Sequence, residues 1–217
     1  MNVSWSATRV ATALLGVLVA VAGIEHGIGE VLQGNVARAG IVIQSWPDSA
    51  FFQNVNGEPA MTVVPNLLAT GVLAIVVSLA FLIWTVWFAE RRCGGAVIVL
   101  LSVVMLLVGG GFGPPLLGII AGVAATRIGA PLTWWRAHLS AGRWRWLSRS
   151  WPYFTGACLA AWLMLFPGLQ LLEYFVGPGS VAVVAAVFLA AMGFLLLTVL
   201  SGFARDADGR AAIAGHH

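Results

Sequence analysis

The chain has 217 residues, of which 60% are hydrophobic and 9% are charged, with a formal net charge of +3. This composition excludes one or two soluble domains, and the basic excess does not indicate nucleic-acid binding because no soluble basic domain is present to carry it. It predicts an all-α polytopic membrane bundle that forms a single integral domain, residues 1–204, followed by a short polar tail, residues 205–217.

Six apolar runs are predicted to span the membrane. A helix that crosses about 30 Å of hydrocarbon needs roughly 20 apolar residues. The third and fourth runs are shorter than that, so they are predicted to form a tight hairpin. The predicted spans are 10–32, 61–88, 95–110, 114–128, 153–176 and 180–203.

The basic residues predict the orientation of these spans. All eleven are arginine, ten of them fall at alternate ends of the spans, and Arg38 alone falls on the other side. Because cytoplasmic loops carry the excess of basic residues, both termini are expected in the cytoplasm and the loop 34–60 outside. An all-arginine basic set is typical of a GC-rich bacterial genome, which predicts a multi-pass protein of the bacterial cytoplasmic membrane.

The first span carries the most informative polar run of the chain, Glu25-His26-Gly27-Ile28-Gly29-Glu30. Ionisable side chains are costly in hydrocarbon and are candidate functional residues by default. Glu25 lies about 24 Å along the helix axis from Arg9, so the run is expected in the outer half of the membrane.

The same span has a second stripe of small residues, Gly16, Ala20, Gly23 and Gly27, which predicts close packing against another helix. A competing interpretation of the first span is a cleaved signal peptide, because Arg9, the apolar run and Ala20-Val21-Ala22 loosely fit that pattern. Cleavage would leave five spans and an external N-terminus.

Two irregular segments follow. The loop 34–60 is long and aromatic, with a turn expected over 56–59, and it either covers the outer helix ends or is an interfacial loop without such a role. The run Gly109–Pro115 lacks the lysine and Ser/Thr of a phosphate-binding loop, so we interpret it as the turn of the hairpin. Its prolines suit the first turn of the next helix.

The segment 131–151 alternates arginine with tryptophan and is predicted to be an amphipathic helix on the cytoplasmic membrane surface. Such a segment favours anionic lipid headgroups as partners over nucleic acid. The residues expected at this lipid interface are Trp135, Arg136, Arg143, Trp144, Arg145, Trp146 and Arg149. The fifth span is expected to start at Ser150-Trp151-Pro152, and Pro167 is expected to kink it.

The polar residues assigned to the outer leaflet come from the first, second and fifth spans. If those helices are neighbours, the side chains converge in one polar cavity, which is the predicted binding or proton and ion site. An alternative is that Glu30, Gln33, Glu173 and Tyr174 lie fully wetted in the headgroup zone. The candidate residues are Glu25, His26, Glu30, Gln33, Asn66, Gln170, Glu173 and Tyr174.

Three classes of function fit the sequence. The first is a small permease, channel or proton-linked transport component, because a buried Glu-His pair can relay protons. The second is a membrane-embedded metal protein or enzyme, in which Glu25, His26 and Glu30 would be the metal ligands. The third is a non-catalytic accessory or lipid-interacting subunit. We favour transport, expect neither a cofactor nor an enzyme, and leave self-association into a homo-oligomer open.

Overall fold

The structure is a computed structural model that describes residues 5–130, 140–177 and 180–214. The chain is mostly helical, at 76%, and the described residues include four helical segments that are long and apolar enough to cross a membrane. Two shorter apolar helices accompany them. The prediction of an all-α membrane bundle is thereby confirmed at this level. The four long segments are Ala7–Gln33, Leu67–Phe88, Ala141–Val176 and Val181–Gly209, and the short ones are Gly94–Leu107 and Gly113–Ala125.

The chain divides into two compact units, each of which is described by itself. Unit 1 comprises Met1–Ala11 and Arg127–His217, and unit 2 comprises Thr12–Thr126. Helix α1 (Ala7–Gln33) therefore contributes its first turn to unit 1 and the rest of its length to unit 2.

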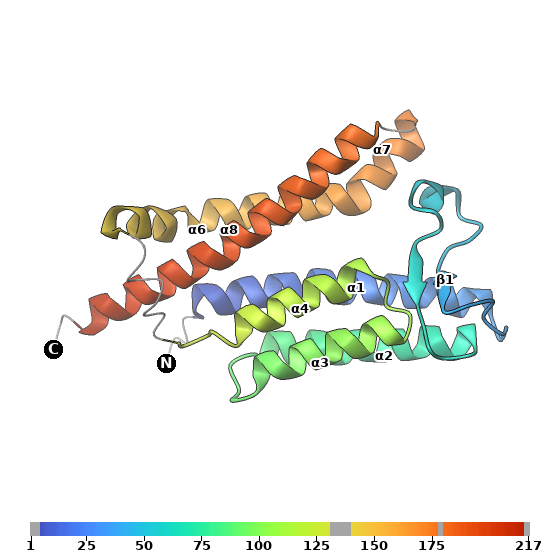
Figure 1. Cartoon of the computed structure of the whole chain (residues 1–217), viewed down its shortest axis with the longest axis horizontal. Helices are drawn as coiled ribbons and strands as arrows, with labels where there is room; N and C mark the ends of the chain where they lie inside the picture. The colour runs from blue at the N-terminus through green and yellow to red at the C-terminus, as the bar shows by residue number, and fades with distance from the viewer. Residues whose placement is uncertain (1–4, 131–139, 178–179, 215–217) are drawn as a thin grey trace. The chain divides into compact units, whose positions relative to one another are not determined.

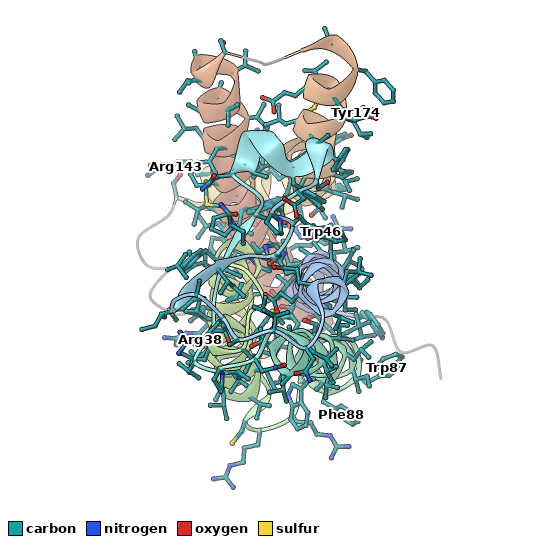
Figure 2. All side chains as sticks on the ribbon, turned by 90° about the vertical axis from the view of Figure 1, so that its right-hand side faces the viewer. Arg38, Trp46, Trp87, Phe88, Arg143 and Tyr174 are labelled. Carbon is teal, nitrogen blue, oxygen red and sulfur yellow. The ribbon has the colours of Figure 1, made fainter. Side chains whose placement is uncertain are left out.

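Unit 2 is a bundle of helices that run alongside one another (Figure 1). Helix α2 packs on α3, and α3 packs on α4. The π-helix at the end of α2 continues it toward Arg91 and Arg92, and Trp87 there projects outward (Figure 2). The bounds are Leu67–Ile83 for α2, Trp84–Phe88 for the π-helix, Gly94–Leu107 for α3 and Gly113–Ala125 for α4.

The small residues of α1 form the packing stripe that the sequence predicts. A Cβ at Gly23 would meet Met105 Sδ at 3.0 Å, and one at Gly27 would meet the Gly71 carbonyl oxygen at 2.7 Å. A Cβ at Gly16 would overlap the side chain of Thr85. Because glycine has no side chain of its own, α1 and α2 approach closely at these positions. Close approach maximises dispersion contacts where no water drives helix association.

The loop after α1 is a folded segment, here called the cap segment (residues 34–61). It contains the strands β1 (Val42–Gln44) and β2 (Pro59–Met61), which pair antiparallel with Ile43 opposite Ala60, and a 3-10 helix (Ala50–Val55) between them. Trp46, labelled in Figure 2, stacks on Phe52 with ring centroids 5.3 Å apart. The loop therefore has a small core of its own.

Both ends of the cap segment are hydrogen-bonded to residues that flank the helices. At its start, Arg38 N donates to Pro65 O over 3.1 Å, and Ala37 forms a bridge with Asn66. At its end, Gly109 N donates to Met61 O over 2.9 Å. These bonds attach the cap segment to the start of α2 and to the turn between α3 and α4.

The turn between α3 and α4 is the predicted hairpin turn. Gly109 and Gly111 have φ of +96° and +78°, in the left-handed region that favours glycine. Pro114 and Pro115 lie in the first turn of α4, as predicted. Proline is tolerated there because the N–H groups of the first turn have no acceptor within the helix.

Unit 1 is built on two long helices that pack side by side, α6 (Ala141–Leu163) and α8 (Val181–Ala214) (Figure 1). A π-helix (Met164–Gly168) and α7 (Leu169–Val176) extend α6. Asp206 of α8 accepts hydrogen bonds from the backbone N–H groups of Ala7, at 2.5 Å, and Thr8, at 3.0 Å. A carboxylate thus satisfies free donors at the N-terminus of α1.

Three boundaries in unit 1 bear on the predictions. Ser140, not Ser150, caps the helix that was expected to start near Pro152, and Pro152 lies inside α6. The expected interruption at Pro167 is present, since Phe166 leaves the helical region with φ −152° and ψ 122°. The predicted polar tail from residue 205 continues α8, which is helical as far as Ala214.

Candidate functional site

The centre of the candidate site is His26, a residue of α1 that is 7% exposed. Its Nδ1 lies 2.9 Å from the carbonyl oxygen of Ala22, one helical turn earlier, and 3.0 Å from Oε2 of Glu25. A carbonyl oxygen only accepts hydrogen bonds, so Nδ1 carries the proton in this contact. The opposite ring nitrogen, Nε2, therefore faces away from α1.

Glu58 of the cap segment meets this opposite side of the ring. Its Oε2 lies 3.3 Å from His26 Nε2, and the residue is 8% exposed. The turn that positions it has positive φ at Asn56, Gly57 and Glu58, which reverses the chain just before β2. Burial raises the pKa of the Glu58 carboxyl to about 8; His26 opposes this rise and the neighbouring Glu25 adds to it.

Glu30 lies one turn further along α1 and is fully buried. Ser45 of the cap segment donates its hydroxyl to Glu30 Oε1 over 3.3 Å, while Oε2 is buried without a hydrogen-bond partner. The Glu30 carboxylate interacts electrostatically with His26 and Glu25. A carboxyl oxygen without a hydrogen-bond partner in an apolar bundle costs stability.

The glycine turn closes the site from a third direction. A Cβ at Gly109 would lie 2.5 Å from both carboxylate oxygens of Glu30, and a Cβ at Gly111 would lie 2.5 Å from His26 Nε2. Only glycine fits here, both because of its φ and because the backbone touches the functional groups. His26 and Glu30 thus lie against both the cap segment and this turn.

Three of these residues, here called the cluster, could hold a metal ion. Glu25, His26 and Glu58 each offer one ligand atom, and these atoms lie within 4.8 Å of one another. This differs from the predicted ligand set in one member, since Glu58 takes the place of Glu30. Imidazole nitrogen with carboxylate oxygen is a ligand set that suits zinc and similar divalent transition metals.

Two other predicted site residues of unit 2 have structural contacts. Gln33 donates its amide to the carbonyl oxygens of Gln44 and Ser45, at 3.0 and 2.9 Å, and so ties the cap segment to α1. Asn66 caps α2 by accepting from Ala69 N over 3.0 Å. These contacts position the cap segment and α2 rather than add ligand groups to the cluster.

The remaining predicted residues belong to unit 1. Gln170 is buried with its Oε1 unpartnered, and Tyr174 projects from α7 into the surroundings (Figure 2). Because Gln170, Glu173 and Tyr174 lie in a different unit from Glu25, their convergence with it stays a prediction.

Of the predicted lipid-facing residues, Trp135 and Arg136 lie outside the described residues. The others are on α6, where the arginines and Trp146 are exposed and Trp144 is buried. Trp144 therefore packs inside the protein rather than facing lipid. The exposed members are Arg143, Arg145, Trp146 and Arg149.

Sequence reasoning missed Glu58 and Ser45. Both lie in the loop, and the hydrophobicity pattern of the sequence does not show which helix residue a loop residue contacts. Ser45 meets Glu30, 15 positions away, and Glu58 meets His26, 32 positions away. The available signal was a carboxylate directly after the turn residues Asn56 and Gly57 in a loop too long to be a simple connection.

Comparison with protein-family models, curated proteins and solved structures finds no match, so function is inferred from the geometry of the chain itself.

Proposed function

We propose that this protein is a proton-linked transport component of the bacterial cytoplasmic membrane, with six spans and both termini in the cytoplasm. The observation that carries the proposal is the buried chain of contacts from Glu25 through His26 to Glu58, which joins a membrane helix to the cap segment. Buried ionisable residues of this kind in membrane helices mark ion and proton pathways.

The arginine distribution supports the orientation. In unit 2 the cluster lies where α1 ends, α2 and α4 begin and the cap segment covers them, whereas Arg91 and Arg92 lie at the opposite ends, between α2 and α3. Since basic residues are retained on the cytoplasmic side, the cluster and the cap segment belong to the outer side.

The cluster is built to accept and release protons. His26 contacts a proton acceptor at each ring nitrogen, and Glu58 contacts both His26 and Glu25. A proton can therefore pass from one of these groups to the next by small side-chain movements, without a large rearrangement of helices. Because Glu58 comes from the cap segment, its motion would connect the cluster to the outer solution.

The proposal is tested in proteoliposomes that enclose a pH-sensitive dye, with the membrane potential clamped by potassium and valinomycin. Wild-type protein is expected to relax an imposed pH gradient faster than protein-free vesicles. Glu58→Gln and His26→Asn are expected to return the rate to that of protein-free vesicles.

Glu90→Gln is the matched control, because it removes one exposed carboxylate at the far end of α2, away from the cluster. It is expected to keep the wild-type rate. A wild-type rate equal to that of protein-free vesicles at every imposed gradient would overturn the proposal and leave an accessory, lipid-interacting role as the better interpretation.

A further inference from the structure

We propose that Glu25, His26 and Glu58 bind a divalent transition-metal cation of the zinc class, and that this cation is the substrate exchanged for protons. The inference rests on the proposed function in naming the cation as cargo. The binding site itself follows from the ligand geometry alone.

The histidine is prepared for a metal at one nitrogen. Nδ1 donates to the carbonyl oxygen of Ala22, 2.9 Å away, and has Glu25 Oε2 at 3.0 Å, which fixes the tautomer and leaves the lone pair on Nε2. Metal-binding histidines almost always donate their other ring N–H to a carbonyl or carboxylate in this way. Glu58 Oε2, 3.3 Å from Nε2, is the second ligand atom.

Glu25 completes the set of three. Its Oε2 orients the imidazole, and its other oxygen, Oε1, is also fully buried, so the carboxylate faces the protein interior with both oxygens. One ligand atom from each of the three residues lies within 4.8 Å of the others, a spacing that one ion can bridge after a small contraction.

An independent observation points to a bound cation. Glu30 is fully buried beside this set, and its Oε2 has no hydrogen-bond partner. Among the described residues in contact with these carboxylates, His26 alone can carry a positive charge. A buried carboxyl oxygen without a hydrogen-bond donor would be stabilised by a metal cation bound beside it.

The charges of the ligand groups favour a divalent ion. Ligand atoms bind metal in their deprotonated forms, and two carboxylates with one neutral imidazole together carry two negative charges, which one divalent cation balances. A neutral site avoids the large desolvation penalty of a net charge in the bilayer.

The donor types narrow the choice of ion. Calcium and magnesium prefer sites made of oxygen alone, and copper(I) prefers sulfur. A site of one imidazole nitrogen and two carboxylates suits Zn²⁺, Mn²⁺, Fe²⁺ or Co²⁺.

The test is calorimetric titration of the full chain in detergent with Zn²⁺, in two buffers of different ionisation enthalpy. All variants carry His216→Ala and His217→Ala, since terminal histidines bind zinc independently. One site is expected, with release of protons on binding, because ligand atoms bind metal in their deprotonated forms. Co²⁺ is expected to give a visible absorption band typical of nitrogen and oxygen ligands.

The variants locate the site. Glu25→Gln is expected to weaken binding about 10–100-fold, because an amide is a poorer ligand than a carboxylate and the histidine loses its orienting charge. His26→Asn and Glu58→Gln are expected to weaken it further, whereas the matched control Glu90→Gln keeps wild-type affinity. Thermal melting without metal confirms that each variant is folded.

Absence of binding by Zn²⁺, Co²⁺ and Mn²⁺ to folded wild-type protein would overturn the proposal, as would wild-type affinity in folded His26→Asn. Its failure is distinguishable from that of the proposed function. Proton flux without metal binding supports the proposed transport function and overturns the cation site. Metal binding at these residues without proton flux supports the cation site and overturns the transport function.

Discussion

Glu58→Gln is expected to stabilise the protein at neutral pH and to flatten the dependence of its stability on pH. An unfolded glutamate ionises near 4.5, whereas burial holds the pKa of folded Glu58 at about 8. Between these values the folded state binds more protons than the unfolded state, so the free energy of unfolding falls as the pH rises through this window. Glutamine has the same shape and cannot ionise, so it removes this loss.

The size of the effect follows from the width of the window. Each pH unit within the window lowers the free energy of unfolding of the wild type by about 1.4 kcal/mol. Between pH 4.5 and pH 7 the loss is therefore about 3 kcal/mol, and Glu58→Gln removes it. The amide keeps a hydrogen bond to His26 or Glu25, which preserves the contacts of the cap segment. A gain of this size in a chain of 217 residues raises Tm by roughly 6–12 °C.

The assay is thermal melting in detergent at pH 5, 6, 7 and 8, without added metal. The variant and the wild type are expected to differ little at pH 5 and increasingly up to pH 8. Glu90→Gln should reproduce the wild-type curve. A Glu58→Gln protein that melts below the wild type at pH 7, or that retains the wild-type pH dependence, would refute the reasoning.

Three further substitutions test contacts within the two units, two of them next to the site and one at the start of α1. Gly111→Ala should destabilise the protein by about 2 kcal/mol, because alanine disfavours the left-handed backbone and its methyl would press on the His26 ring, and a lowered Tm measures this. Gly71→Ala should cost about 1–3 kcal/mol by forcing α2 away from the α1 backbone at Gly27, again read from Tm. Asp206→Ala should cost about 1 kcal/mol, seen as lower Tm and faster hydrogen exchange in the first turn of α1.

Each of these has a built-in comparison. Gly142 lies in α6, and a Cβ there would meet no atom within 4 Å, so Gly142→Ala should leave Tm unchanged or raise it slightly. Asp208 is on the same helix as Asp206, and Asp208→Ala controls for the loss of a charge from α8. Equal effects from a test substitution and its control would contradict the packing argument.

The sequence predicts much of the helical architecture because length and hydrophobicity determine which segments can cross a bilayer. The packing stripe on α1 was also predictable, since the four small residues recur at helical spacing and small residues allow close approach wherever a partner helix exists. The identity of that partner, α2, was not readable, because spacing on one helix carries no information about its neighbour.

The helix boundaries in unit 1 show where local signals fail. Pro152 suits a first helical turn, but a proline inside an apolar helix is tolerated when surrounding groups satisfy the freed carbonyls, and α6 continues through it. The charged residues after Phe203 predict a short polar tail, yet Asp206 accepts hydrogen bonds from the start of α1, 198 or more positions away. Such a tertiary contact cannot be read from local sequence.

The candidate site was half predictable. Glu25, His26 and Glu30 stand out because ionisable residues are rare in a span, so their cost is visible in the sequence itself. Glu58 is an ordinary loop residue by composition, and its burial follows from the pairing of β1 with β2 and the attachment of the cap segment. The sequence therefore predicts the candidate residues of helix α1 but not Glu58, the loop residue that completes the possible ligand set.

The attachment of the cap segment at both ends has a kinetic consequence. Its start is joined to the beginning of α2 and its end to the glycine turn, so the segment cannot swing away as one piece. Under the proposed function, an ion would reach His26 only when the stretch between β1 and β2 loosens locally. Occupancy of the cluster would then change on the timescale of local unfolding, microseconds or slower, and this loosening, not diffusion, would limit the rate of turnover.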